Sequence, residues 1–368
     1  MSSRREFLGK AAGIAGLCFT GCGLLAPHVH AQGGGRRLVT VGGKRVKVID
    51  VHAHAAIPEA MELAGQKIGQ GTNRPDLVVA GQTMTQRIAD MDAQGIDMEA
   101  LSINSYWYGQ PREVAEKIIR IQNEKLAELI GKHGERFTAF ASVALQFPDL
   151  AAQQLQDGVK KYGLKGAAIG GSVAGQEISD AKFNPFWAKV EELGVPVFIH
   201  PQADGATKDM MHRFKGKNGR PDNVIGYPLE TTIALSRLIF DGTLDRYPKL
   251  KIIGAHGGGF LPSYAGRSDR GCPTFPPACP GGKHGAIKKE PSEYLKQMFY
   301  DTMVFTNEGL RHLIAEVGVS QLMVGTDYPF PWTKTAVDHV LNAPGLSDAD
   351  KAAILEGNAA KALGLTTA

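Results

Sequence analysis

The sequence of 368 residues lacks a strong charge of either sign. Its 41 Lys and Arg stand against 37 Asp and Glu, which gives a net charge of +4, and no block of like charge is present. A charge this close to neutral gives no argument for nucleic-acid binding, and we expect no nucleic-acid partner. Internal repeats and low-complexity tracts are also missing. With 43% hydrophobic and 21% charged residues, the chain is expected to fold as an ordinary globular protein.

The N-terminus carries an apolar run that is too short to span a membrane. Residues 11–26 are apolar, whereas a membrane-spanning helix needs ~20 residues. Arg4 and Arg5 precede the run, and small residues suited to cleavage follow it near Ala31. The segment Arg-Arg-Glu-Phe-Leu-Gly-Lys resembles the twin-arginine export signal of bacteria. We therefore interpret residues 1–31 as a signal peptide and expect export to the periplasm by the twin-arginine (Tat) machinery.

Two alternatives to a cleaved signal stay open. The segment could form an amphipathic first helix of the mature fold, although the polar Gly-Gly-Gly-Arg-Arg stretch at 33–37 is typical of a linker. The segment Phe-Thr-Gly-Cys at 19–22 loosely resembles a lipidation box, so a lipid anchor at Cys22 is the minor alternative. We expect a linker over residues 32–45 and a single domain over residues 46–368.

Cysteine is scarce, and its spacing excludes a zinc knuckle. Cys18 and Cys22 lie in the predicted signal, while Cys272 and Cys279 lie in a segment rich in Pro and Gly. Their separation is wider than the two to four residues that a zinc knuckle places between thiols. In an oxidising periplasm the pair can close a short disulfide loop, and two free thiols are the alternative.

The rest of the sequence alternates short apolar runs with longer amphipathic ones. Amphipathic patterns over Arg112–Gly131 and Phe183–Leu193 predict helices between strands. Eight strands that alternate with helices favour an α/β fold with a parallel sheet, and eight strands close a (β/α)8 TIM barrel. A doubly wound sheet is the alternative. The predicted strands are Val46–Val51, Glu99–Ile103, Phe137–Val143, Gly166–Ile169, Pro196–Ile199, Lys251–Ala255, Met298–Met303 and Leu322–Gly325.

Polar residues stand where four of these strands end. His52 and His54 follow the first strand, His200 ends the fifth, His256 the sixth and Asp327 the eighth. In a parallel barrel these ends open on one face, which holds the active site. Because residues i and i+2 of a strand point to the same side, His52 and His54 are placed to share one ion.

The four strand ends predict a metal centre with one histidine to spare. His52, His54, His200 and Asp327 form a ligand set for one divalent ion, Zn²⁺ first and Mn²⁺ as the alternative. The set leaves room for a water or a substrate oxygen. His256 could be a fifth ligand, but an acid/base role facing the metal is the more useful one.

Several motifs together resemble the amidohydrolase superfamily over residues 47–365, and within it the metal-dependent decarboxylases. The aminocarboxymuconate-semialdehyde decarboxylase group matches best. The resemblance rests on Ile-Asp-Val-His-Ala-His at 49–54, Pro-Val-Phe-Ile-His-Pro at 196–201, Ala-His-Gly-Gly-Gly at 255–259 and Gly-Thr-Asp-Tyr-Pro-Phe at 325–330. The related benzoate-type decarboxylases carry a glutamate shortly after the sixth-strand histidine, whereas this sequence has glycine at 257–259.

The resemblance implies roles for individual residues. It matches His52, His54, His200 and Asp327 to the metal ligands and His256 to the catalytic histidine, with Asp327 sharing in proton transfer. It matches Arg267 to an arginine that binds a substrate carboxylate across a dimer interface, so a homodimer is expected. Arg74 lies near the position of a second substrate-binding arginine. Lys165 stands at the start of the fourth strand, away from the metal, so a second metal is not expected.

The resemblance favours a non-oxidative decarboxylase that acts on an unsaturated or aromatic carboxylic acid. The alternative uses the same site to hydrolyse an ester, lactone or amide, because the superfamily runs both reactions on one ligand set. A third possibility is a periplasmic protein that binds metal or ligand without turnover.

Overall fold

The computed structural model describes residues 35–71, 73–202, 220–275 and 287–366. The predicted signal, residues 1–31, lies outside the described residues. Residues 36–368 form one unit. None of its described helices combines the length and the hydropathy that crossing a membrane requires.

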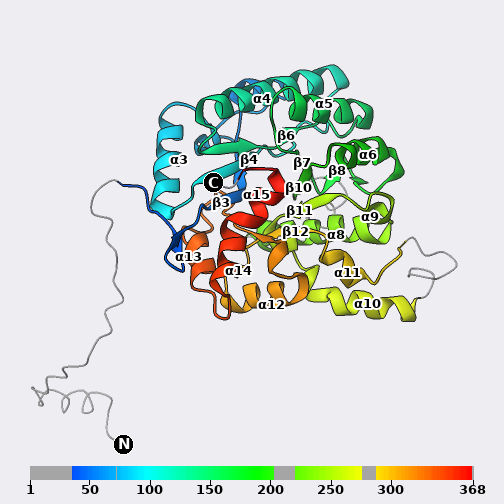
Figure 1. Ribbon diagram of the computed structural model, residues 1–368. Helices are drawn as coiled ribbons and strands as arrows, with labels where there is room; N and C mark the ends of the chain where they lie inside the picture. The colour runs from blue at the N-terminus through cyan, green and yellow to red at the C-terminus, as the bar shows by residue number, and fades with distance from the viewer. Residues whose placement is uncertain (1–34, 72, 203–219, 276–286, 367–368) are drawn as a thin grey trace, which may run out of the picture. The chain divides into compact units, whose positions relative to one another are not determined.

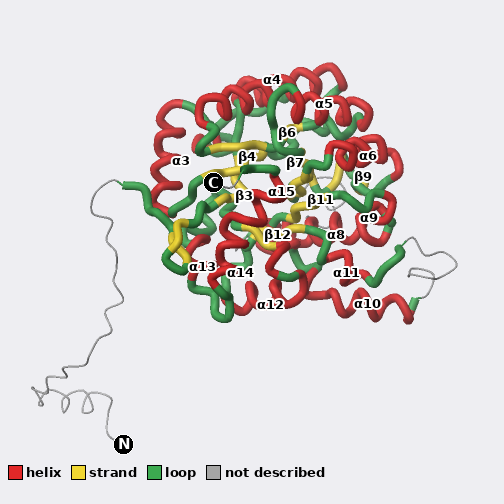
Figure 2. Tube along the Cα trace, viewed as in Figure 1, coloured by secondary structure: helices red, strands yellow, loops and turns green. Residues whose placement is uncertain are grey.

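The described residues contain a ring of eight parallel strands with helices around it (Figures 1 and 2). One of the eight is interrupted at Phe140, so it is recorded as two short strands. In chain order the ring consists of β3 (Ile49–His54), β4 (Met98–Ser102), β5 (Phe137–Ala139) with β6 (Ala141–Ser142), β7 (Ala167–Gly170), β10 (Pro196–His200), β11 (Lys251–Gly254), β12 (Phe299–Asp301) and β13 (Leu322–Met323).

Two joints close the ring. At the interrupted strand, β5 pairs with β4 while β6 pairs with β7. At the other joint, the chain beyond β13 pairs with β3. There the Val51 N–H donates to Val324 O at 2.9 Å, and the Asp327 N–H donates to His52 O at 2.7 Å. A closed ring confirms the (β/α)8 barrel and rules out a doubly wound sheet, whose edge strands stay open.

All eight predicted strands are present, but the first lies three residues later than expected. We predict it over Val46–Val51, and the structure places β3 at Ile49–His54. The apolar pattern began too early because Val46 and Val48 are buried outside the strand. Val46 pairs instead with Val39, whose carbonyl accepts from its N–H at 3.0 Å.

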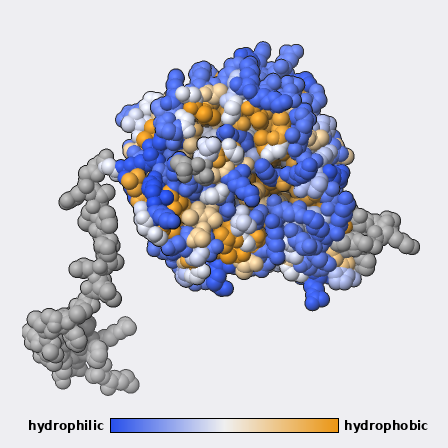
Figure 3. All heavy atoms as spheres, in the orientation of Figure 1, coloured by the Kyte–Doolittle hydropathy of each residue, from blue (hydrophilic) through white to orange (hydrophobic). Residues whose placement is uncertain are grey.

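The outer helices bury one apolar stripe each. In α4 (Arg112–His133) the buried residues recur every three or four positions, as in Ala115, Ile118 and Leu126. Hydrophilic side chains cover most of the outer helices in Figure 3. The other α-helices are α2 (Pro58–Leu63), α3 (Gly81–Gln94), α5 (Pro148–Lys160), α6 (Asn184–Leu193), α8 (Tyr227–Phe240), α9 (Thr243–Arg246), α10 (Ala265–Thr274), α11 (Pro291–Leu295), α12 (Asn307–Val317), α13 (Ala336–Leu341), α14 (Asp348–Ala352) and α15 (Asn358–Leu363).

The inside of the ring is a packed core that is closed at one end by α15, which crosses the middle of the view in Figure 1. Inward-facing residues such as Val51, Phe198 and Ile253 pack together, and Leu363 of α15 belongs to the same cluster. Ile49, at the start of β3, is also a member. Because α15 packs on the ends where the strands begin, the opposite ends are left for a site.

Residues 36–45 belong to the segment that we expect to be a linker, and they pack against the barrel. β1 (Thr40–Val41) and β2 (Lys44–Arg45) form an antiparallel pair. Val39 is buried, and Arg37 forms an ion pair with Asp338 of α13. The buried residues Val39 and Val41 were the sequence signal for packing here, but the Gly- and Arg-rich composition around them led us to expect a linker.

Cys272 of α10 is buried and disulfide-bonded. This excludes two free thiols. Its partner lies outside the described residues, so the pairing with Cys279 stays a prediction.

A buried ion pair supports the first βα unit. Arg87 of α3 donates through Nε to Glu99 Oε2 of β4 at 2.6 Å, and both side chains are 1% exposed. Arg87 also donates to the backbone carbonyl of His54 at 2.8 Å, and its guanidinium lies 4.7 Å from the centre of the Tyr328 ring. The pair therefore holds a helix, a strand and the carboxyl end of β3 in one network.

We expect Arg87→Met to lower the free energy of unfolding by about 3–5 kcal/mol, because it leaves the Glu99 carboxylate buried without a partner. Arg112→Met is the matched control. Its ion pair with Asp149 is exposed, so the loss should stay below about 1 kcal/mol. Urea unfolding in excess chelator measures both values. Equal losses in the two variants would contradict the structural role of Arg87.

Candidate metal centre and active site

A cavity of ≈ 970 Å³ lies at the carboxyl ends of the strands, and four of the five predicted residues line it. They are His54 from β3, His200 from β10, His256 just after β11 and Asp327 after β13. The fifth, His52, is fully buried beside them. The structure therefore brings together all five residues that the strand ends predicted.

Their ligand atoms converge on one point. The Nε2 atoms of His52 and His54 are 3.2 Å apart. Asp327 Oδ1 lies 2.8 Å from His54 Nε2 and 3.3 Å from His52 Nε2. One ligand atom from each of His52, His200, His256 and Asp327 lies within 4.8 Å of the others. His54 is outside this group of four although it touches two members, and His256 is inside it although we expect it to be the catalytic residue.

The surroundings of the His200 side chain show that these residues fit a divalent cation. This side chain is buried, and neither of its ring nitrogens has a hydrogen-bond partner among the described residues. A buried polar group without a partner is costly unless something else satisfies it. Ligands held by bonds of ~2.0–2.1 Å stand about 3 Å from one another, which matches the 3.2 Å between the Nε2 atoms of His52 and His54.

The electrostatics of the metal-free site also suit a cation. Burial would lower the pKa of His52, but the neighbouring Asp327 and Asp301 carboxylates outweigh it and raise the pKa to about 10. Burial lowers the pKa of His54, and burial with the neighbouring histidines holds that of His200 well below its ordinary value. Burial acts to raise the pKa of Asp327. The charge of His52 and the hydrogen bonds that Asp327 accepts from the neighbouring histidines nevertheless hold this pKa well below its usual range. A divalent ion would take the place of the proton on His52.

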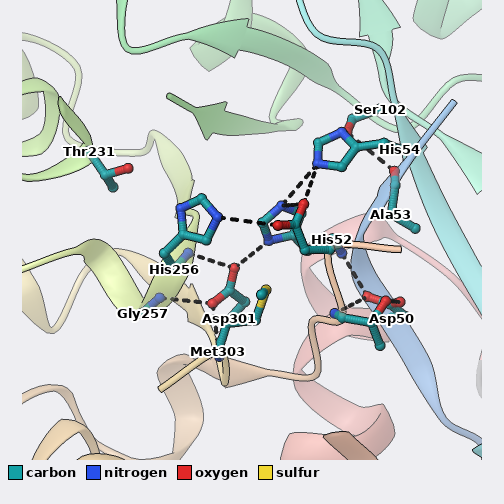
Figure 4. A network of polar contacts seen from close by, with 12 residues as sticks. Asp50, His52, Ala53, His54, Ser102, Thr231, His256, Gly257, Asp301 and Met303 are labelled. Carbon is teal, nitrogen blue, oxygen red and sulfur yellow. Dashed lines mark hydrogen bonds and ion pairs between the residues drawn. The ribbon is translucent and has the colours of Figure 1, made fainter. Parts of the chain in front are cut away.

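Asp301 is a functional residue that the sequence reasoning missed. It is the last residue of β12 and is fully buried. One of its oxygens accepts from His52 Nδ1 at 2.7 Å and from the His256 N–H at 2.8 Å, and the other accepts from the Gly257 N–H at 2.8 Å. Figure 4 shows this carboxylate between the two histidines. Our predicted strand over Met298–Met303 places Asp301 inside the strand, whereas β12 ends at Asp301, so the strand-end signal that pointed to the other five residues did not identify it.

The hydrogen bond from Nδ1 to Asp301 settles which nitrogen of His52 faces the site. With its proton on Nδ1, His52 presents the lone pair of Nε2 toward His54 and Asp327. A carboxylate behind a metal-binding histidine is a common device that orients the ring and raises its basicity.

Glycine is required at positions 257–259 because a Cβ atom would collide with neighbouring residues and because the backbone has positive φ angles. A Cβ on Gly258 would lie 2.6 Å from the Tyr300 ring, and one on Gly259 would lie 2.1 Å from Pro228 O. Both residues also have positive φ angles, of 77° and 67°. The glycine run thus lets the chain after β11 turn closely enough to aim His256 at the cavity.

His256 and Asp327 themselves adopt left-handed backbone conformations. Their φ angles are 55° and 60°, values that are uncommon outside glycine. Strain of this kind persists where the surrounding structure holds a residue in place, and it gathers at functional sites. Here the hydrogen bonds of Asp301 and of the β3 backbone hold the two residues.

The two predicted substrate-binding arginines do not line the cavity. Arg74 forms an ion pair with Asp76 two residues along the chain and lies beside Asn73, which does line it. Arg267 is exposed on α10 and forms no hydrogen bond or ion pair within the described residues. Lys165 precedes β7, at the end of the barrel away from the histidines, as expected.

A (β/α)8 barrel with histidines and an aspartate converging at its strand ends defines a metal-dependent enzyme. The chain belongs to the amidohydrolase family, whose model matches residues 49–365. Membership confirms the superfamily that the motifs indicated.

Curated relatives of the chain are named as decarboxylases. The chain is 29% identical to 2-amino-3-carboxymuconate-6-semialdehyde decarboxylase of Dictyostelium discoideum over 76% of each chain. It is 31% identical to gamma-resorcylate decarboxylase of Rhizobium sp. (strain MTP-10005) over 74% of this chain and 84% of that one. Since both groups are similarly close, the glycines at 257–259 do not by themselves assign the chain to either.

Solved structures agree. The 5-carboxyvanillate decarboxylase of Sphingomonas paucimobilis superposes with a TM-score of 0.77 at 26% identity, covering 87% of this chain and 100% of that one. The dihydroxybenzoic acid decarboxylase of Polaromonas sp. JS666, solved with bound manganese and the inhibitor 2-nitroresorcinol, gives a TM-score of 0.73 at 28% identity over 88% and 98% of the chains.

We expect Asp301→Asn to weaken metal binding by about 10–100-fold, because the amide can no longer take the charge-assisted hydrogen bond from His52 Nδ1. His52→Ala should abolish stoichiometric binding altogether. His312→Ala, which removes an exposed histidine on α12, should change nothing. Titration of the chelator-treated protein with Zn²⁺ or Mn²⁺, checked by elemental analysis, measures all three. Unchanged affinity in Asp301→Asn, or full occupancy in His52→Ala, would contradict these assignments.

Proposed function

We propose that the protein is a metal-dependent, non-oxidative decarboxylase of an aromatic or unsaturated carboxylic acid. The observation that carries the proposal is the convergence of four histidines and Asp327 at the base of one cavity, in a chain whose relatives are named as decarboxylases. Hydrolysis of an ester, lactone or amide needs the same ligand set, so the two reactions are separated by assay.

The cofactor in this proposal is one divalent ion, Zn²⁺ with Mn²⁺ as the alternative. His52, His54, His200 and Asp327 would hold it, because these four residues are buried whereas His256 is only partly buried. A bound divalent ion acts as a Lewis acid toward a substrate oxygen and stabilises the negative charge that develops during the reaction. The manganese in the Polaromonas relative supports a divalent ion and favours the Mn²⁺ alternative.

The chain itself must move one proton. When a carboxylate leaves as CO₂, the carbon–carbon bond breaks, its electron pair stays on the ring or vinyl carbon, and that carbon takes a proton. His256 is the group we assign to this transfer. Its side chain lines the cavity, its Nε2 lies 3.8 Å from Asp327 Oδ2, and its Nδ1 has no partner among the described residues. Asp327 is placed to exchange that proton with it.

Substrate binding by the arginines remains part of the proposal. Arg267 is exposed on its own subunit and does not line that subunit's cavity, which supports a role toward the cavity of a partner in a homodimer. A guanidinium binds a carboxylate with two parallel hydrogen bonds. Arg74 would need to leave Asp76 to take part.

We expect His256→Ala to retain its metal and to lose activity by about 10²–10⁴-fold, the range for removing a general acid or base. The test follows CO₂ release from a panel of aromatic and unsaturated acids, and acid production from a panel of lactones and esters. CO₂ release by the wild type supports the decarboxylase. Acid production without CO₂ would replace it with the hydrolase, and full activity in His256→Ala would remove that residue from proton transfer.

We propose further that residues 1–31 direct export by the Tat machinery, which places the mature protein in the periplasm. Support comes from the Arg4–Arg5 pair before the apolar run and from where the packed chain begins. Arg36 pairs with Asp97 and Arg37 with Asp338, so cleavage near Ala31 leaves every one of these contacts intact. A lipid anchor at Cys22 is the alternative.

Replacing Arg4 and Arg5 by lysine should keep the protein in the cytoplasm while leaving its folding and metal content unchanged. The wild type is expected in the periplasmic fraction of a bacterium that has a Tat system, and in the cytoplasm when that system is deleted. Cys22→Ser is the matched control. Release from the membrane fraction on this substitution would identify a lipid anchor, and export of the lysine variant would contradict the signal.

A further inference from the structure

The cavity is several times larger than one aromatic ring needs. Its volume is ≈ 970 Å³, whereas an apolar cavity of about 150 Å³ takes up a benzene ring. Volumes of this size accommodate ligands of two rings or more and bury most of their surface. A single-ring acid bound at the histidines would leave most of the cavity to be filled by something else.

Two aromatic side chains stand at the mouth of this cavity with much of their surface exposed. Phe305 and Trp332 both line the cavity, and they are 52% and 42% exposed. Their ring centres are 6.0 Å apart with the planes tilted by 32°. Val224, also a large exposed apolar residue, lines the same cavity. Exposed apolar side chains gathered around a concave site mark a place where a ligand binds.

Phe305 adopts a strained backbone conformation at this position. Its φ is 58°, in the left-handed region that a bulky residue such as phenylalanine rarely adopts. The Phe305 ring contacts Trp332 but stays largely exposed to solvent. Burial of an apolar side chain on folding therefore does not explain a phenylalanine at this position. Strained residues gather at ligand-binding sites, where the conformation serves to present the side chain.

A second aromatic position lies deeper in the cavity. The Phe330 ring packs edge-on against His54 with 5.7 Å between ring centres, so it stands next to the metal ligands. Phe330 and Trp332 are two residues apart in the sequence. The backbone N–H of Trp332 donates to the backbone carbonyl of Phe330 at 2.8 Å. Their Cα atoms are therefore at most about 7 Å apart. The inner and outer aromatic positions are spaced for two directly linked or closely bridged planar groups.

The charges of the described side chains that line the cavity restrict the chemical class of the ligand group that binds at the mouth. Among the described residues that line the cavity, none is a lysine or an arginine. A second carboxylate at the mouth would find no cation on these residues, whereas a flat apolar group would find Phe305, Trp332 and Val224.

We propose that the site takes an aromatic acid with a second planar apolar group opposite its carboxylate, and that Phe305 and Trp332 hold this group at the cavity mouth. The proposal rests on the proposed decarboxylase, since the acid end must face His52, His54 and Asp327. The edge of the ring opposite the acid then points to the mouth.

The test uses the manganese-loaded protein and two ligands that do not react. One is 2-nitroresorcinol, the inhibitor bound by the Polaromonas relative, and the other is its 5-phenyl derivative, which adds a ring opposite the nitro group. We expect the phenyl derivative to bind about tenfold more tightly or better in isothermal titration. In Trp332→Ala and Phe305→Ala this preference should shrink to about threefold or less, with the affinity for 2-nitroresorcinol nearly unchanged.

Leu63→Ala is the matched control, because Leu63 is a similarly exposed apolar residue that does not line the cavity. It should keep the full preference. Tryptophan fluorescence gives a second readout: Trp332 lines the cavity whereas Trp107 and Trp187 are fully buried, so quenching by the phenyl derivative should be weaker in Trp332→Phe than in the wild type.

Equal affinity of the two ligands for the wild type, or an undiminished preference in both alanine variants, would overturn the inference and leave the decarboxylase standing. Failure of both ligands to bind the metal-loaded protein would overturn the proposed function together with the inference.

Discussion

The site depends on one backbone joint, the parallel pairing of β3 with the chain beyond β13. The Asp327 N–H donates to the carbonyl of His52, so the first and last strands of the barrel place a carboxylate next to two histidines. Residues from opposite ends of the domain meet only because the ring is closed. An open sheet built from the same strands would leave His52 and Asp327 on separate edges.

Once the ring is closed, a single buried carboxylate organises the rest of the centre. Asp301 accepts a hydrogen bond from the ring of His52 and two from the backbone of the turn that carries His256. It thereby couples the orientation of His52, a proposed metal ligand, to that of the residue we assign to proton transfer. This coupling also explains the glycines at 257–259, since a bulkier chain could not approach Tyr300 and Pro228 closely enough to offer its N–H groups.

Away from this centre, the cavity lining includes a group of exposed apolar side chains as well as polar ones such as Gln66 and Gln70. Close to the histidines the lining is set by the reaction, whereas Phe305, Trp332 and Val224 at the mouth take no part in holding a metal or moving a proton. These residues lie farther along the segments that begin at the site: Trp332 follows Asp327 after β13, and Val224 follows His200 after β10.

The sequence by itself determined the alternation of strands and helices, the number of strands, and the five polar residues at strand ends. These features are local, because strand periodicity and the position of His52, His54, His200, His256 and Asp327 relative to an apolar run can be read within a few residues. The tertiary structure alone decided which strand pairs close the ring, that Asp301 faces His52 rather than the core, and that residues 36–45 pack on the barrel instead of trailing as a linker. It also decided that Arg74 and Arg267 do not line the cavity. Each of these outcomes depends on contacts between residues far apart in the chain, whose distances and directions no short-range pattern contains.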